Sequence, residues 1–313
     1  MSDPVERLLG TVYFITRVCE RHECRLTPHD DMMAAFAVAW RDAEVRHGMR
    51  TAALCVEPTH YHAVVIDSAG RLSDFLRDVH ATVARFGNAV EDARVKFWSL
   101  EGTHVVEVMD AQAAVDCVAY VLANPVKDRL VRALAEWPGI LTKVDDIGRD
   151  RGARYERPAA FFAVNGPVSS EVELVAVVPA MAVTAFGVDG YRERVRRAVW
   201  RVVEGSHAEA RADGRGFMGA TRVKAQSVWC RVRGPEARRA GTRAEPKRRV
   251  AAAAKATVEA TLARMKAFRE AYRAVRARWV AGEHGAEFPR GTWWLWRFCG
   301  VARVGSEPYA PSA

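Results

Sequence analysis

The first 125 residues alternate between β-branched or aromatic runs and segments whose apolar residues recur at helical spacing. The runs suit the half-buried surface of a sheet, and the other segments suit amphipathic helices. Five strands are predicted, at about residues 11–17, 51–57, 60–66, 94–99 and 103–109. Three helices are predicted between and after them, at about residues 30–47, 73–86 and 111–123. The order βαββαββα predicts a single sheet covered by helices.

Glycine and proline predict where these helices end. Gly48 is expected to close the first helix, and Gly87-Asn88 to close the second. Pro125 predicts that the third helix ends near Ala123, because the residue before a proline disfavours the α conformation.

Charge divides the 313-residue chain into two halves. Residues 1–150 hold 17 Lys and Arg against 23 Asp and Glu, whereas residues 151–313 hold 30 against 15. The excess of basic residues in the second half predicts either a polyanionic partner such as nucleic acid or a merely solvated basic surface. The chain is expected to be mostly helical after residue 190, and residues 247–281 predict a basic helix because they lack Pro and Gly.

Several protein classes are excluded at this stage. The longest mostly apolar stretch, residues 174–188, is interrupted by Pro179, so no membrane span is expected. The first thirty residues lack the pattern of a secretory signal. The six cysteines are scattered without a Cys-x-x-Cys pair, which predicts reduced thiols in a cytoplasmic protein.

Two histidines open the third predicted strand, in the sequence His60-Tyr61-His62. Strand side chains alternate between faces, so the two imidazoles point the same way, about 6.6 Å apart along the chain, and Tyr61 points to the other face. Two imidazoles on one face can share a metal ion, although such pairs also occur as ordinary polar surface.

Tyr120 and Asn124 lie one turn apart on the third predicted helix and therefore share a face. One interpretation is a tyrosine at the core edge with Asn124 as a C-terminal cap. Together with His60 and His62, Asn124 instead predicts a three-ligand site for a divalent cation with open positions for a phosphate oxygen. Such ligands suit Mn²⁺ and, less readily, Mg²⁺. Tyr120 would attack the phosphorus as the nucleophile.

This combination resembles the single-tyrosine HUH transposases, and most of all the REP-associated tyrosine transposases and related insertion-sequence enzymes. The resemblance lies in His60-Tyr61-His62 after Pro58 and in the segment Tyr120–Val126, and it covers about residues 11–142. Thr59 departs from the family pattern, which usually has asparagine there. Weaker likeness lies in four further segments: Tyr13–Arg17, Lys96–Trp98, His104–Val106 and Trp137-Pro138.

The resemblance implies an α+β fold with a ferredoxin-like antiparallel sheet and flanking helices over residues 1–145, followed by a basic, mostly helical C-terminal region over 146–313. It implies cutting and joining of single-stranded DNA, often next to hairpins, through a 5′-phosphotyrosine and with Mg²⁺ or Mn²⁺. By position, His60 and His62 match the family's metal ligands, Tyr120 matches the nucleophile, and Asn124 matches the polar residue that completes the site.

Basic side chains in both halves are candidates for DNA contact, with a solvated surface as the alternative for each. These candidates are Arg17, Arg21, Lys127, Lys255, Arg269 and Arg273. His104 is a candidate for supporting the metal site, or a structural histidine. The tryptophans of the segment 293–296 are expected to dock on the main domain rather than to stack on unpaired bases.

Two other functions remain open from the sequence. A domesticated protein could bind hairpin DNA or RNA without cutting it, although binding alone needs neither the histidine pair nor Tyr120. A small-molecule oxygenase or hydrolase would explain the histidines but not the basic half. The sequence also leaves open whether the protein is a monomer or a homodimer.

Overall fold

A five-stranded sheet organises the computed structural model, which describes residues 5–158, 170–231, 249–292, 295 and 299–302. The strands lie in the order β2-β3-β1-β4-β7. The first four are antiparallel to their neighbours, and β7 joins β4 in parallel. Their bounds are β1 Thr11–Val18, β2 Met49–Glu57, β3 His60–Asp67, β4 His104–Val108 and β7 Val250–Ala251.

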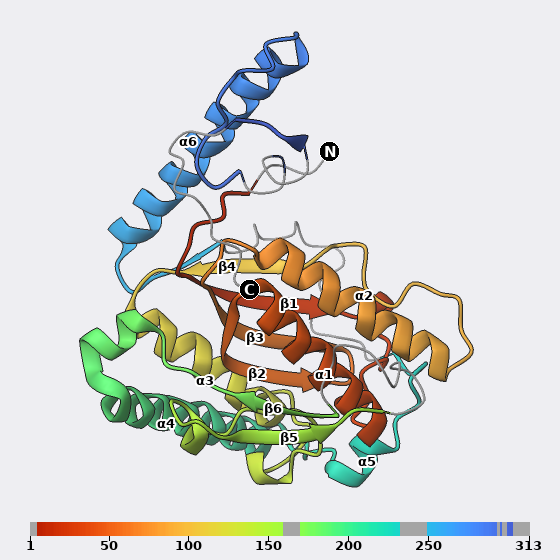
Figure 1. The fold of residues 1–313 in the computed structure, drawn as a ribbon. Coiled ribbons are helices and arrows are strands. Elements are labelled where there is room, and N and C mark those ends of the chain that lie inside the picture. The colour runs from red at the N-terminus through yellow and green to blue at the C-terminus, as the bar shows by residue number, and fades with distance from the viewer. Residues whose placement is uncertain (1–4, 159–169, 232–248, 293–294, 296–298, 303–313) are drawn as a thin grey trace.

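Three helices cover this sheet: α1 (Asp30–His47), α2 (Leu72–Val90) and α3 (Ala111–Lys127). Helix α1 connects β1 to β2, α2 connects β3 to β4, and both pack on one face, while α3 covers the opposite face (Figure 1). The order βαββαβ with neighbouring strands β2-β3-β1-β4 is a ferredoxin-like α+β fold, which confirms the predicted fold class.

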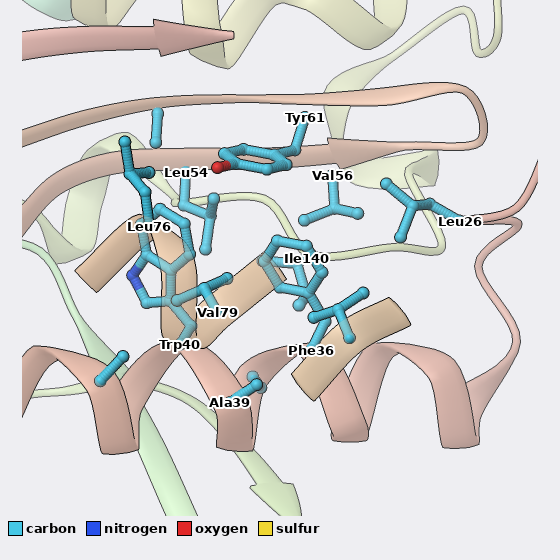
Figure 2. Close-up of a cluster of buried hydrophobic side chains, with 14 of the residues drawn as sticks. Leu26, Phe36, Ala39, Trp40, Leu54, Val56, Tyr61, Leu76, Val79 and Ile140 are labelled. Atoms are coloured by element: carbon cyan, nitrogen blue, oxygen red, sulfur yellow. The ribbon is translucent and has the colours of Figure 1, made fainter. Parts of the chain in front are cut away.

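The face beneath α1 and α2 carries an aromatic core. The Tyr61 ring of β3 lies edge-on to Phe36 and Trp40 of α1, with ring centroids 5.4 and 5.6 Å away. Figure 2 shows Tyr61 projecting from its strand toward these helix side chains. Because strand side chains alternate, this placement turns His60 and His62 to the α3 face, as predicted.

A second core lies between the sheet, α3 and the long helix α4 (Ala180–Asp213). Val118 and Val121 of α3 are fully buried in it together with Tyr191 and Val195 of α4. Helix α3 is therefore packed between the sheet and the first long helix of the basic half.

The rest of the described chain is mostly helical, as expected. It holds a two-stranded antiparallel sheet, short helices and α6, which extends away from the sheet edge where β7 pairs with β4 (Figure 1). The bounds are β5 Gly152–Glu156, β6 Glu171–Val175, α5 Ala220–Lys224, α6 Lys255–Val280, and the 3-10 turns η1 Glu20–His22, η2 Leu134–Glu136 and η3 Val144–Asp146. No helix in the described ranges has the length and apolarity needed to span a bilayer.

The strand predicted at 94–99 is wrong. These residues make an isolated bridge, between Trp98 and Cys19, instead of a ladder. Strand β4 pairs with β1 only from Val12 to Thr16, and residues 97–99 meet the short remainder of that edge, where the Ser99 N–H donates to the Val18 carbonyl oxygen (3.0 Å). That remainder is too short for a ladder. The segment packs instead against α2, where the Trp98 indole donates a hydrogen bond to the carbonyl oxygen of His80 (2.9 Å).

Gly48 closes α1 as predicted, in the left-handed conformation with φ of 64°. The predicted end of α2 at Gly87-Asn88 is wrong, because the helix continues to Val90. Gly87 serves close packing there: a Cβ at this position would overlap the Phe97 ring.

The predicted end of α3 is also wrong, because the helix continues through Pro125 to Lys127. The carbonyl oxygen of Pro125 accepts hydrogen bonds from the backbone N–H groups of Leu130 and Val131 (2.9 and 3.2 Å), which keeps the chain turning after the proline. Asn124 thus lies inside the helix, and its side chain is not a terminal cap.

Candidate functional site

Strand β3 and helix α3 bring two histidines and a tyrosine together on the α3 face of the sheet. The His60 and His62 rings lie 4.6 Å apart between centroids and are nearly perpendicular. The Tyr120 ring lies 5.3 Å from the His62 ring. Tyr120 is 36% exposed, so a large ligand could reach its side chain from solvent.

Two side chains of the central strand β1 contact His62 and Tyr120. Phe14 stacks on His62 with centroids 5.6 Å apart, and it meets the Tyr120 ring edge-on at 5.7 Å. Two residues on, Thr16 Oγ1 lies 2.8 Å from Nδ1 of His62. That hydrogen bond orients the imidazole and leaves Nε2 as the nitrogen that can take a ligand.

His60 is oriented by its neighbour. Thr59 Oγ1 lies 2.9 Å from Nδ1 of His60, so this hydroxyl orients the ring. Burial lowers the pKa of His60 to about 4 and the pKa of His62 well below its usual value. Both imidazoles are therefore neutral near pH 7, which is the form that binds cations.

Sequence analysis missed two carboxylates beside His60. Glu57, at the end of β2, is 1% exposed, and its Oε2 lies 3.4 Å from His60 Nε2. Single ligand atoms of Glu57, His60 and Asp128 all lie within 4.8 Å of one another. Burial raises the pKa of Glu57 well above its usual range, and the negative charge of Asp128 raises it further. The signal in the sequence was an acidic residue just before the histidine strand and another just after the tyrosine helix.

Asn124, on the same face of α3 as Tyr120, is wholly buried. Its amide faces the Glu57 carboxyl and lowers the pKa of that group, yet neither Oδ1 nor Nδ2 makes a hydrogen bond of good geometry. A buried amide left without partners costs about 1–3 kcal/mol. An unpartnered amide oxygen next to the Glu57 carboxyl fits a divalent cation that prefers nitrogen and oxygen ligands.

Lys127 adds a positive charge next to Tyr120. Its Nζ lies 4.8 Å from the centre of the Tyr120 ring and donates a hydrogen bond to Asp128 (3.2 Å). Burial alone lowers the pKa of Lys127, but Asp128 and Tyr120 outweigh burial and raise it above its usual value. The amine is therefore charged at neutral pH.

Three other predicted residues of the N-terminal half, His104, Arg17 and Arg21, lie on different faces or elements. His104 of β4 shares the Thr16 register position with His62, so the two histidines flank Thr16 on one face of the sheet. Arg17 lies on the opposite face, with its guanidinium 5.7 Å from the Trp98 ring. Arg21 lies in the exposed turn after β1.

The structure does not bring the predicted basic residues of the C-terminal half to Tyr120. Lys255, Arg269 and Arg273 belong to α6, which contacts β7 at the sheet edge. The predicted docking of Trp293, Trp294 and Trp296 lies outside the described residues.

No protein-family model matches this chain, and no curated protein matches it. Among solved structures, the chain is similar to a REP-associated tyrosine transposase bound to a REP hairpin, with 19% identity and a TM-score of 0.38 over 44% of this chain and 81% of that one. It is also similar to a candidate transposase from Deinococcus radiodurans R1, with 16% identity and a TM-score of 0.28 over 36% of this chain and 91% of that one. Both likenesses are low in identity and span less than half of this chain.

Proposed function

We propose that this protein is a metal-dependent endonuclease and strand transferase acting on single-stranded DNA, of the single-tyrosine HUH transposase type. The observation that carries the proposal is the convergence of Tyr120 on the His60 and His62 pair, with ring centroids of Tyr120 and His62 5.3 Å apart. A phenol, two neutral imidazoles and the Lys127 amine gather where a phosphate could be bound from solvent.

In this proposal Tyr120 is the nucleophile. Its hydroxyl oxygen forms a bond to phosphorus, the bond from phosphorus to the 3′-oxygen breaks, and the products are a 5′-phosphotyrosine and a free 3′-hydroxyl. The phenol proton passes to solvent, and the departing oxygen takes up a proton. The Lys127 ammonium stabilises negative charge on the attacking oxygen, and Phe14 holds the Tyr120 ring in place.

His60, His62 and Asn124 would hold Mg²⁺ or Mn²⁺. A cation bound there would polarise the phosphoryl group and stabilise charge on the leaving oxygen. Thr16 and Thr59 hold the two imidazoles through their Nδ1 atoms, which leaves each Nε2 as the nitrogen that can bind the cation.

Tyr120→Phe should abolish the covalent protein–DNA adduct while binding persists, because only the attacking oxygen is removed. The substrates are single-stranded oligonucleotides with flanking hairpins, labelled at the 3′ end because that fragment stays on the tyrosine. Adducts are counted on a denaturing gel and binding by mobility shift. Tyr155→Phe, a change of the same kind on β5, is the matched control and should leave the adduct yield unchanged. An undiminished adduct in Tyr120→Phe would reject the nucleophile assignment.

Replacing both His60 and His62 with Ala should remove cation-dependent cleavage. Cleavage by the unaltered protein that persists in excess EDTA would reject the metal assignment. Tight hairpin binding without any adduct in either Mg²⁺ or Mn²⁺ would support the alternative of a binding protein that does not cut.

A further inference from the structure

We infer that the cation site of this chain is rich in carboxylates: Glu57 binds the divalent cation directly together with His60, and Asp128 supplies a second carboxylate at its solvent side. The inference rests on the proposed cation site but not on the chemistry of Tyr120. It adds two charged oxygen ligands to a set otherwise made of imidazole and amide groups.

Strand pairing places Glu57 next to His60. The two residues are direct partners in the antiparallel β2–β3 pair, so their side chains project from the same face. Glu57 Oε2 and His60 Nε2 lie 3.4 Å apart. Ligand atoms about 2.1 Å from one ion lie about 3 Å from each other in octahedral geometry, so this separation suits two ligands of a single cation.

The buried polar atoms around this point provide independent evidence. Glu57 is 1% exposed, and its Oε1 has no hydrogen-bond partner. Asn124, wholly buried and facing Glu57, makes no hydrogen bond of good geometry through either amide atom. Buried polar groups are normally hydrogen-bonded, because an unmet group loses its hydration without compensation. Two unmet groups facing each other beside an imidazole indicate a missing shared ligand.

Charge balance favours a divalent ion at this point. Glu57 and Asp128 together carry two negative charges when ionised, and the imidazoles of His60 and His62 are neutral. A divalent cation would neutralise the pair, and carboxylate oxygens are ligands that Mg²⁺ and Mn²⁺ prefer. Asp128 also accepts a hydrogen bond from Lys127 (3.2 Å), so cation binding would compete with that contact.

The test is metal affinity measured by titration calorimetry on the chelator-stripped full chain, with MnCl₂ and MgCl₂ as probes. Glu57→Gln preserves size but removes the charge, and it should weaken Mn²⁺ binding at least tenfold. Asp128→Asn should weaken it about threefold, because that residue is exposed. Asp116→Asn, with the same charge change at an exposed position of α3, is the control and should stay within twofold of the unaltered protein.

Equal Mn²⁺ affinity in Glu57→Gln and the unaltered protein would overturn the inference. Should Glu57→Gln fail to fold, as judged by thermal unfolding in EDTA, Glu57→Asp and Asp128→Asn decide it: the first should retain part of the affinity, the second should lose some, and unchanged affinity in both would overturn it.

The adduct assay separates this inference from the proposed function. Glu57-dependent Mn²⁺ binding without any adduct supports the site and rejects the nuclease. A cation-dependent adduct, together with an Mn²⁺ affinity that Glu57→Gln leaves unchanged, supports the nuclease and rejects Glu57 as a ligand.

Discussion

Individual polar side chains in this protein lie where water scarcely reaches, and their protonation depends on their neighbours. His80 of α2 is an example away from the candidate site. Its Nε2 lies 2.7 Å from the Tyr61 hydroxyl, and burial, aided by the Arg17 guanidinium, lowers its pKa to about 3. The histidine therefore stays neutral in the folded protein at pH values where an unfolded chain would protonate it.

His80 should make the protein less stable as the pH falls from about 6.5 toward 3. Over that range the unfolded chain takes up a proton that folded His80 cannot, which costs up to about 1.4 kcal/mol per pH unit. His80→Gln keeps a polar partner for Tyr61 and should reduce this slope by nearly one proton. Urea unfolding at several pH values measures it. His29→Gln, at an exposed histidine, is the control, and equal slopes in both variants would contradict the expectation.

At the level of elements, one ion-pair cluster fastens the C-terminal helix to the sheet. Arg264 of α6 contacts both Glu107 of β4 and Glu6 of the N-terminal segment. Burial raises the pKa of both carboxyls, and the guanidinium opposes that rise. The short strand β7 adds a parallel pairing at the same edge. Arg264 thus holds together three segments that are distant in sequence.

Arg264→Ala should loosen α6 and β7, because it leaves two neighbouring carboxylates without their cation. We expect a loss of about 1–3 kcal/mol, felt first in these two elements. Hydrogen exchange of residues 250–251 and 255–280 should become faster than in the unaltered protein. Lys266→Ala removes an exposed pair with Glu270 and should cost less than about 0.5 kcal/mol. Equal protection in the two variants would contradict a fastening role for Arg264.

In the whole molecule, the acidic and basic halves share one core. The basic half supplies α4, whose Tyr191 and Val195 are fully buried against α3. The predicted boundary at residue 145 follows charge and motif, whereas the second core continues across it. Helix α3 carries Tyr120 and Asn124, so α4 supports the helix that positions the candidate nucleophile.

A fragment of residues 1–145 should therefore be much less stable than the full chain. It would expose the α3 surface that Tyr191, Val195 and Val199 cover, and each such side chain contributes about 1.5–3 kcal/mol when buried. Thermal unfolding followed by circular dichroism compares the two proteins. A fragment that unfolds within a few degrees of the full chain would show that α4 is dispensable for the fold.

Local periodicity explains what the sequence alone predicted. Alternation along β3 separates the two histidines from Tyr61, and helical spacing puts Tyr120 and Asn124 on one face; both follow from strand and helix geometry. The order of strands and helices also has this local origin. These features predicted a single sheet covered by helices, whereas the ferredoxin-like arrangement and the roles of the candidate site residues came from the resemblance to the HUH transposases.

Tertiary contacts determined what the sequence could not reveal. Residues 94–99 form no ladder because β4 covers the edge of β1 as far as Thr16 and leaves only its last residues to pair. Gly87 lies within α2, where the Phe97 ring packs against it. Glu57 and Asp128 meet His60 because the β2–β3 hairpin lies beside the end of α3. Backbone geometry repeats every few residues and can be predicted from local patterns, whereas the meeting of distant groups depends on how whole elements pack.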